Sequence, residues 1–180
     1  MRQIARAKLA DYSNVRFTDG DCENTKLADN SVDFITAAQA FHWFDVDKFK
    51  SESRRILKTT GKAVLIWNRR DEDYVVNLEV AEIMKKYCPR FHGFGGGGKD
   101  DVAIQRYFSQ GYEIFECENN IAYDRNSFIG RNLSGSYAIQ QGDAEYEFFI
   151  NELDELFDRF SSQGQMTVPH KTVAYWGAVE

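Results

Sequence analysis

Three segments of the sequence carry side chains that could bind a small organic ligand, and each follows a stretch that we predict to be a strand. They are DGDCE at 19–23, TAAQAFHWFD at 36–45 and WNRRD at 67–71. Open α/β sheets bind their ligands at the carboxyl ends of parallel strands, so these positions predict one shared site. The aromatic rings could line a cleft. Arg69 and Arg70 could bind an acidic substrate, although a solvated loop is the favoured interpretation for these arginines.

The histidines and cysteines form none of the usual catalytic or metal-binding patterns. They are scattered along the chain as His42, His92, His170, Cys22, Cys88 and Cys117. No histidine adjoins a serine or cysteine in a nucleophile arrangement, and an odd number of distant cysteines favours buried thiols over disulfides or zinc ligands. The glycines at 95–98 lack the spacing of a phosphate loop, so we interpret 92–101 as a flexible loop. We therefore predict no metal site.

The composition is that of one globular domain spanning residues 1–180. The chain is 43% hydrophobic and 28% charged, and its net charge is -6. This acidic balance, without a run of basic residues, argues against nucleic-acid binding. No apolar stretch approaches the roughly 20 residues that cross a bilayer, and the N-terminus lacks the apolar core of a signal peptide. We therefore expect a cytoplasmic protein that binds neither nucleic acid nor membrane.

The order of the expected elements is that of a parallel α/β sheet. Strands are predicted at VRFT (15–18), at VDFITA (32–37) and at KAVLIW (62–67), the last two apolar enough to be covered on both faces. Helices are predicted over 2–12, from a cap at Asp45 to a stop at Gly61, over 73–87 and over 143–161. Further strands are expected at 112–123 and at 171–179, the last of them as an antiparallel edge.

The three ligand-binding segments, in this order, resemble the class I S-adenosylmethionine-dependent methyltransferases. LADNSVDFI and SESRRILKTTGKAVLIW join them, and the AFHWFD signature is similar to the small-molecule branch that includes trans-aconitate methyltransferase-like proteins. SGSYAI at 134–139 and the closing TVAYWGAV extend the resemblance over most of the chain. It implies a truncated Rossmann-like sheet, mostly parallel with an antiparallel C-terminal edge strand. The implied activity is methyl transfer from S-adenosylmethionine to a small-molecule acceptor.

The resemblance assigns cofactor contacts to two of the segments. Asp21 would accept a hydrogen bond from the adenine amino group, and the backbone of Cys22 would meet the neighbouring ring nitrogen. Ala37, Ala38 and Gln39 would pass under the methionine part of the cofactor. On residue type alone, Asp21 could instead be a carboxylate that caps its own loop.

The methyl-transfer cleft would be lined by the residues that follow the VDFITA strand. Gln39, Phe41, His42 and Trp43 are expected to face it, with Gln39, His42 and Trp43 as the catalytic candidates. Such a transfer needs orientation of the acceptor more than it needs a base. His42 and Trp43 could equally pack beneath the loop without a catalytic role.

One departure from the family pattern concerns the cofactor's ribose and methionine ends. In the family, a Gly-rich turn and a strand ending in an acid hold these groups, and both precede what is here Met1. MRQIARAKL resembles the helix that follows that acid, so we expect a chain that begins inside the fold and binds S-adenosylmethionine weakly or not at all. The alternative function is a non-catalytic remnant or interaction module that binds no cofactor.

This departure also has a consequence for assembly. In the family's sheet, two strands that this chain lacks lie between VRFT and VDFITA, so the second of these would become an open edge. We expect either VRFT to move in beside VDFITA or a second copy of the chain to pair there and form a homodimer.

Overall fold

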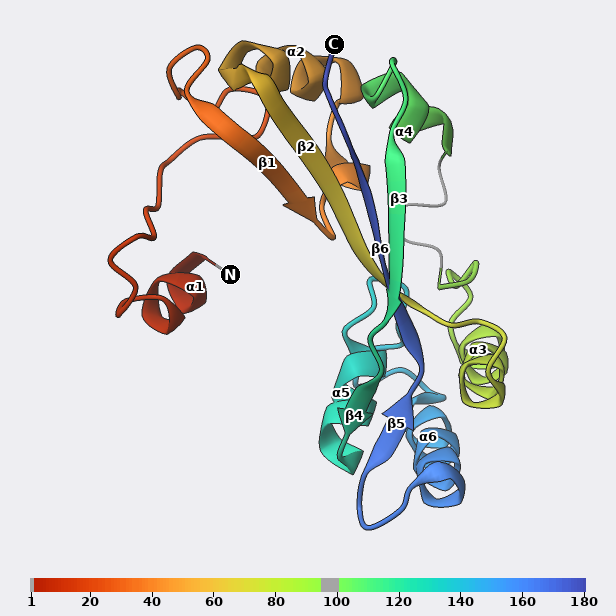
Figure 1. Cartoon of the computed structure of the whole chain (residues 1–180). Coiled ribbons are helices and arrows are strands. Elements are labelled where there is room, and N and C mark those ends of the chain that lie inside the picture. The colour runs from red at the N-terminus through yellow and green to blue at the C-terminus, as the bar shows by residue number, and fades with distance from the viewer. Residues whose placement is uncertain (1, 95–100) are drawn as a thin grey trace.

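A four-stranded sheet forms the centre of the computed structural model, which describes residues 2–94 and 101–180 (Figure 1). Its strands are β1 (Val32–Ala38), β2 (Leu57–Arg70), β3 (Glu113–Glu118) and β6 (His170–Gly177), in the order β1-β2-β6-β3. β1 and β2 pair in parallel, whereas β6 is antiparallel to both β2 and β3. The α/β class and the antiparallel last strand are as expected. However, β6 lies inside the sheet and not at its edge, because β3 pairs along its outer side.

The described residues also form seven helical elements and a two-stranded sheet. The helices are α1 (Arg2–Lys8), the 3-10 helix η1 (Phe41–Trp43), α2 (Val46–Ile56), α3 (Val75–Tyr87), α4 (Asp101–Tyr107), α5 (Arg125–Leu133) and α6 (Tyr146–Phe160). The small antiparallel sheet pairs β4 (Ile121–Tyr123) with β5 (Met166–Val168). Within the described residues, no helix has the length and apolar character that a membrane span requires.

One apolar core lies between the four-stranded sheet and the helices α2 and α4. The Asp45 carboxylate caps α2 by accepting a hydrogen bond from the Lys48 N–H at 3.2 Å, as the sequence predicts. Phe49 of α2 and Tyr107 of α4 stack with ring centroids 5.1 Å apart. Both rings are buried in one cluster with Leu65 and Trp67 of β2, which are fully inaccessible to solvent. This packing fixes α2 against one face of the sheet, beside β1 and β2.

A second apolar core lies beyond the far ends of β2 and β6, among α3, α5, α6 and the β4–β5 pair (Figure 1). The predicted helices over 73–87 and 143–161 both form here, with slightly later starts. Val80 of α3 and Phe149 and Leu153 of α6 are fully buried against each other. The two cores share no residue, so the fold consists of a sheet layer and a helical lobe.

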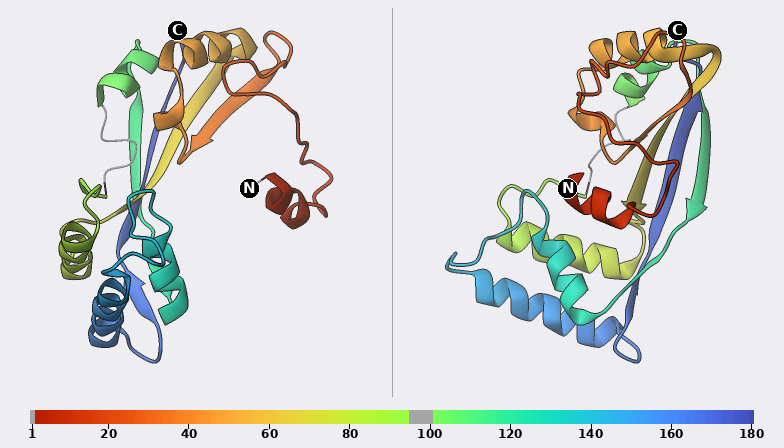
Figure 2. Two further views of the ribbon diagram at one scale, coloured as in Figure 1. Left: turned by 180° about the vertical axis from the view of Figure 1, so that it is seen from behind. Right: turned by 90° about the vertical axis from the view of Figure 1, so that its left-hand side faces the viewer.

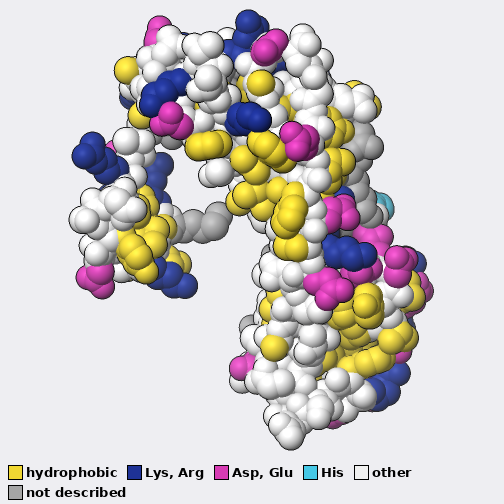
Figure 3. Space-filling model, in the orientation of Figure 1, with side chains coloured by type: hydrophobic (Ala, Val, Ile, Leu, Met, Phe, Trp, Pro, Cys, Tyr) yellow, Lys and Arg dark blue, Asp and Glu magenta, His cyan; other side chains and the backbone are white. Residues whose placement is uncertain are grey.

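The opposite face of the four-stranded sheet carries no helix among the described residues, as the right-hand view of Figure 2 shows. Apolar side chains gather on this exposed side (Figure 3). Phe34 of β1 is 67% exposed and Phe115 of β3 is 60% exposed. The expectation that VDFITA is covered on both faces is therefore wrong, since Ala37 alone is buried in β1.

The VRFT segment at 15–18 is not a strand in the structure. It belongs to an extended linker between α1 and β1, and α1 stands away from the sheet (Figures 1 and 2). An isolated strand gains no ladder hydrogen bonds, and none of the described strands lies beside this segment to supply them. VRFT therefore does not move in beside VDFITA, and the outer edge of β1 has no neighbour among the described residues.

Gly61 does not end the preceding helix, because α2 stops at Ile56 and Gly61 lies within β2. A Cβ atom at this position would lie 2.8 Å from a side-chain carbon of Leu57 and 3.2 Å from the carbonyl oxygen of Asp33. The strand pairing is irregular at this point, where the register of β1 against β2 shifts between Val32 and Phe34. Glycine is thus required by the close approach of two strands.

The predicted strand at 112–123 is two strands, β3 and β4, separated by a pair of asparagines. The Asn119 N–H donates to the carbonyl oxygen of His170 at 2.9 Å, and the Asn120 side-chain oxygen accepts from the His170 N–H at 3.1 Å. These bonds hold the start of β6 and divert the chain into the helical lobe. Of the loop predicted at 92–101, residues 95–100 lie outside the described residues.

Candidate functional site

A cavity of about 350 Å³ opens at the carboxyl end of β1, where the sequence analysis placed a site. The loop 22–25, β1, the residues that follow it and α2 surround it. Its lining is mainly apolar and consists of Cys22, Thr25, Ile35, Thr36, Ala37, Ala38, Ala40, Phe44, Phe49, Ser53 and Ile56. A concave apolar site with a few polar groups at its edge is the usual form of a small-molecule pocket.

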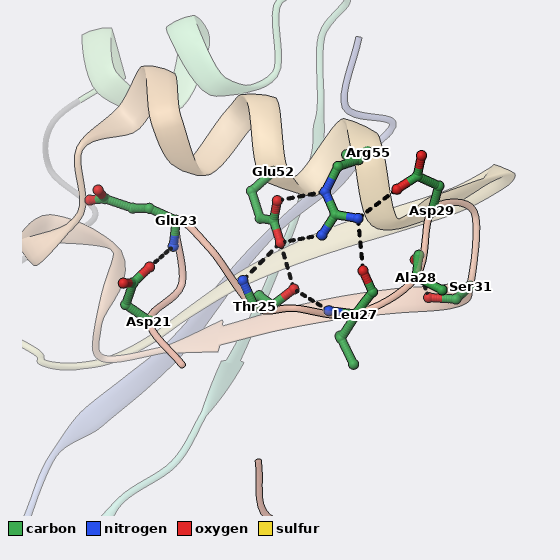
Figure 4. A network of polar contacts seen from close by, with 9 residues as sticks. All are labelled: Asp21, Glu23, Thr25, Leu27, Ala28, Asp29, Ser31, Glu52 and Arg55. Carbon is green, nitrogen blue, oxygen red and sulfur yellow. Dashed lines mark hydrogen bonds and ion pairs between the residues drawn. The ribbon is translucent and has the colours of Figure 1, made fainter. Parts of the chain in front are cut away.

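The loop 21–25 is tied to the start of α2 by backbone and carboxylate groups. The Asp21 carboxylate accepts a hydrogen bond from the Glu23 N–H at 2.9 Å and so closes its own turn (Figure 4). The Glu23 carboxylate accepts a hydrogen bond at 3.0 Å from the N–H of Asp45, the residue that caps α2. The Lys48 ammonium lies 3.3 Å from the Asp45 carboxylate. These bonds therefore attach this end of the cavity to the first turn of α2.

Glu52 of α2 holds the other end of the loop from within the protein (Figure 4). Its carboxylate accepts hydrogen bonds from the Thr25 N–H at 2.8 Å and the Thr25 hydroxyl at 2.6 Å. It also accepts two from the Arg55 guanidinium, at 2.8 and 2.7 Å, and Arg55 bonds further to Asp29 at 2.6 Å. Glu52 is only 8% exposed. The Arg55 guanidinium, with the Thr25 donors, lowers the pKa of Glu52 to about 2.

The predicted cofactor residues are brought together only in part. Cys22, Ala37 and Ala38 line the cavity, whereas Asp21 lies exposed beside it with its carboxylate engaged in the turn. Partial burial and the nearby Glu23 carboxylate raise the pKa of the Cys22 thiol, so it stays protonated at neutral pH. The loop-capping role of Asp21 is thus present in the structure, and it does not exclude a contact of the second carboxylate oxygen with a ligand.

Gln39 is fixed against β2 and is not among the residues that line the cavity. Its N–H donates to the Ile66 carbonyl and its side-chain amide donates to the Asn68 carbonyl, each at 2.9 Å. Its φ of 52° lies in the left-handed region, which is uncommon for a residue other than glycine. Strained backbone of this kind concentrates at ligand-binding turns, so the observation favours a role for this turn in function.

The aromatic residues after Gln39 separate into a core residue and two exposed ones. Phe41 is buried, with its ring 5.3 Å from that of Tyr107, so the expectation that it faces a cleft is wrong. His42 is exposed, its ring centroid lies 4.9 Å from that of Trp43, and Trp43 is 77% exposed. Neither ring packs beneath the loop, because η1 turns both outward while Phe41 anchors it.

Arg69 and Arg70 do not form a solvated loop, because β2 continues through both of them. Arg69 donates to the Tyr175 hydroxyl at 2.9 Å and Arg70 donates to the Asn132 side-chain oxygen at 2.8 Å.

The three cysteines were expected to be buried, but only Cys88 is buried in the structure. Cys22 is half-buried and Cys117 is exposed. The described residues contain no cluster of histidine, cysteine and acidic side chains that could hold a metal ion.

Sequence reasoning missed the residues of α2 that form the far wall of the cavity. Phe49, Ser53 and Ile56 recur at intervals of four and three, which is the spacing of one helix face. An apolar helix face of this spacing predicts packing against the core and does not by itself indicate a cavity wall. Because the cavity lies at the margin of the core, this apolar face of α2 both packs into the core and lines the cavity.

Comparisons with known proteins match the part of the chain that contains this site. A family profile described as "Methyltransferase domain" matches residues 1–65, a range that includes the loop 21–25, β1 and α2. An uncharacterized methyltransferase-like protein of Schizosaccharomyces pombe is 35% identical over 109 residues, which are 53% of this chain and 41% of that protein. An uncharacterized methyltransferase of Mycobacterium bovis is 42% identical over 65 residues, which are 36% of this chain and 27% of that protein. The matched part of the chain thus spans less than half the length of these relatives.

A similarity in fold extends over a longer stretch of the chain. A solved structure from Anaeromyxobacter dehalogenans, provisionally named a type II methyltransferase, superimposes with a TM-score of 0.64. The match covers 93% of this chain and 73% of that one at 18% identity. The N-terminal third of the chain is therefore similar in sequence to methyltransferases, and most of the chain shares the fold of this solved structure.

Proposed function

We propose that the chain carries the acceptor side and part of the cofactor site of a methyltransferase that acts on a small molecule. The observation that carries this proposal is the apolar cavity between the loop 22–25, β1 and α2. It lies at the carboxyl end of a parallel strand, which is where sheets of this kind bind nucleotides. The resemblance to methyltransferases makes S-adenosylmethionine the cofactor to be tested against it.

The residues present fit the adenine part of that cofactor. Thr36, Ala37 and Ala38 line the cavity along β1 with small side chains and backbone, and the exposed Asp21 carboxylate lies beside the lining residue Cys22, where it can accept a hydrogen bond from an amino group. For the ribose hydroxyls the fit is poorer, because no acidic residue is among those that line the cavity. We therefore propose that these residues hold the nucleobase and leave the rest of the cofactor weakly held.

When bound, the cofactor supplies an electrophilic methyl group, so the protein's task is orientation and exclusion of water. Gln39, His42 and Trp43 stand next to the cavity on the turn after β1, and we propose that they position the acceptor. Trp43 presents a large exposed ring that an organic molecule can cover. Gln39 holds the turn through its bond to the Asn68 carbonyl and so acts as a positioning residue.

Adenosine tests the proposed nucleobase site without any need for catalysis. In nuclear magnetic resonance titrations of the 180-residue chain, we expect saturable shifts confined to the cavity-lining residues. Ala40→Phe adds a ring at a half-buried position of the cavity lining, so it should raise the dissociation constant for adenosine at least about tenfold. Ala122→Phe makes the same change at an exposed position of β4 and should leave binding unchanged. Titrations without shifts at the cavity would support the non-catalytic alternative.

We also propose that a second copy of the chain covers the outer edge of β1. The supporting observation is that this edge has no neighbour among the described residues, while Phe34 beside it is largely exposed. Phe34→Lys puts a charge on the proposed interface, so light scattering should show a dimer for the unchanged chain and a monomer for this variant. Phe148→Lys, at an equally exposed position on α6, should stay dimeric. A monomeric unchanged chain at high concentration would contradict the proposal.

A further inference from the structure

Residues 2–20, which we call the arm, make all their polar contacts with one another. Arg2 forms an ion pair with Asp19, and the Arg6 guanidinium carbon lies 5.7 Å from the centroid of the Phe17 ring. Among the described residues, every hydrogen bond, ion pair and cation–π contact of the arm lies within these limits. No residue of α1 is buried. The rest of its own chain therefore does not hold the arm in place.

The helix of the arm presents apolar side chains to water. Ile4 is 61% exposed, and Leu9 and Tyr12 just beyond α1 are exposed as well. α1 has seven residues, whereas isolated helices shorter than about 12 to 15 residues are marginal in water. Such a helix gains most of its stability from packing its apolar side against another surface. The arm therefore needs a surface that its own chain does not supply.

The open face of the four-stranded sheet is an apolar surface without a cover. Leu65 and Trp67 of β2 are fully buried on the helical side, so the alternating positions between and before them face the open side. The apolar side chains of this face, which we call the open-face patch, are Phe34, Val64, Ile66, Phe115, Ala174 and Trp176.

The open-face patch is continuous across the sheet and wide enough for a helix. Val64 pairs with Trp176, and Ile66 pairs with Ala174. Ala174 pairs in turn with Phe115 on β3. Four strands spaced about 4.8 Å apart span about 14 Å, and a helix with its side chains is about 10 to 12 Å across. One short helix would therefore cover the middle of the patch.

The arm and the edge of the patch carry opposite charges. The arm contains four basic residues and two acidic ones. β3 carries three glutamates among its six residues. One of them, Glu113, is the direct cross-strand partner of Trp176, so it lies at the margin of the patch. Lys62 on the same face is engaged by the Trp176 ring, with its ammonium 4.1 Å from the ring centroid. The charges therefore favour a basic helix as the occupant.

The position of α1 indicates which copy of the patch it covers. The helix lies beyond the outer edge of β1, on the side away from β2 (Figures 1 and 2). The proposed second copy pairs at this edge, so the arm extends toward that copy. Arg2 and Arg6 bind Asp19 and Phe17 within the arm and so hold α1 on this side, away from the open face of its own chain.

We infer that α1 of each copy packs on the open-face patch of the second copy, so that the two chains exchange their arms. The inference rests on the dimer proposed above and names the contact that holds it. Pairing of the β1 edges alone would leave both open faces uncovered. In a reciprocal exchange each copy gives one helix and receives one, so the contact closes about a two-fold axis.

A spin label on the arm tests this contact between copies. Lys8→Cys, in a chain whose Cys22 and Cys117 are replaced by serine, carries the nitroxide. This chain is mixed in equal amounts with a ¹⁵N-labelled chain that carries no nitroxide. The Trp176 indole N–H signal should lose about half its intensity, because random pairing gives half of the ¹⁵N-labelled chains a nitroxide-bearing partner. Amide signals of α6 should keep their intensity, and reduction of the nitroxide should restore the Trp176 signal.

Two variants of α1 separate apolar packing from charge. Ile4→Glu puts a carboxylate into the apolar contact, so it should abolish the loss of the Trp176 signal and raise the dissociation constant of the dimer at least about tenfold. Gln3→Glu adds the same charge at the neighbouring exposed position and should leave both nearly unchanged. Light scattering over a range of concentrations gives the dissociation constant. Because Ile4 is largely exposed in a single copy, Ile4→Glu leaves the core of the chain intact.

Three results would overturn the inference. A dimer with an unchanged Trp176 signal would exclude the exchange of arms and leave the pairing of β1 edges standing. A nitroxide-bearing, ¹⁵N-labelled chain that loses its own Trp176 signal even in a large excess of unlabelled chain would show that α1 packs on its own sheet. A monomer at every concentration would exclude the exchange together with the proposed dimer, while leaving the adenosine titration unaffected.

Discussion

Titration of the 180-residue chain with S-adenosylmethionine should yield a dissociation constant about two to four orders of magnitude weaker than that of a methyltransferase in which an acid binds the ribose. A carboxylate that accepts both ribose hydroxyls makes two charged hydrogen bonds, each worth about 1.5 to 3 kcal/mol. The residues lining the cavity include no acid, so about 3 to 6 kcal/mol is lost, which is two to four decades in affinity. Apolar contacts with the nucleobase would then supply most of the remaining affinity.

Comparison of two ligands makes this measurement decisive. If the described residues hold only the nucleobase, adenosine and S-adenosylmethionine should bind with dissociation constants within about tenfold of each other. Calorimetry or nuclear magnetic resonance at high ligand concentration would give both values. A micromolar constant for S-adenosylmethionine, with one site per chain, would contradict the expectation. It would mean that this chain or its second copy supplies partners for the ribose and methionine groups.

Glu52→Gln should lower the free energy of unfolding by about 2 to 3 kcal/mol, because the carboxylate accepts four hydrogen bonds and two of them come from the Arg55 guanidinium. The glutamine amide can replace only one acceptor oxygen, and its NH₂ group faces the donors of Arg55. Urea unfolding would measure the loss. Glu155→Gln, an exposed position on α6, serves as the control and should change stability by less than about 0.5 kcal/mol.

The Glu52 carboxylate also makes the stability difference between the unchanged chain and Glu52→Gln depend on pH, and the direction of that dependence follows from its pKa. Its pKa of about 2 in the folded chain lies below the value of about 4.3 for an unfolded glutamate. The stabilisation by Glu52 is therefore fully present above about pH 4.3 and is lost as the pH falls toward 2. The stability difference between the unchanged chain and Glu52→Gln should shrink over this range. A constant difference between pH 6 and pH 3 would show that the charge of Glu52 does not support the loop.

Elements that a local residue pattern specifies were predictable from the sequence. Strands that need a neighbouring strand to form were not. Asp45 caps its helix, and the helices with Val80 and Phe149 form because three- and four-residue spacing buries one face. The apolar content of VDFITA and VRFT predicts two strands, but a strand forms only where an adjacent strand supplies its backbone hydrogen bonds. VDFITA has β2 on one side, while VRFT has none among the described residues.

The candidate site was predictable to a similar extent. Position at the carboxyl end of a parallel strand places Ala37 and Ala38 at the cavity. Cys22 also lines the cavity, although the VRFT segment before it is not a strand. The separation of Phe41 from Trp43 could not be read from FHW, since a single turn of 3-10 helix decides which ring points inward. The contact of Arg70 with Asn132 was hidden as well, because Asn132 lies 62 positions further along the chain.

The division of the apolar interior into two cores has a consequence for cooperativity. The cavity belongs to the sheet core, whereas the helical lobe has a core of its own and contributes no residue to the cavity lining. Each unit can open by local unfolding without exposing the amides of the other. A ligand that binds in the cavity would therefore stabilise the sheet core alone. Its binding would then appear in hydrogen exchange as protection confined to the amides of that core.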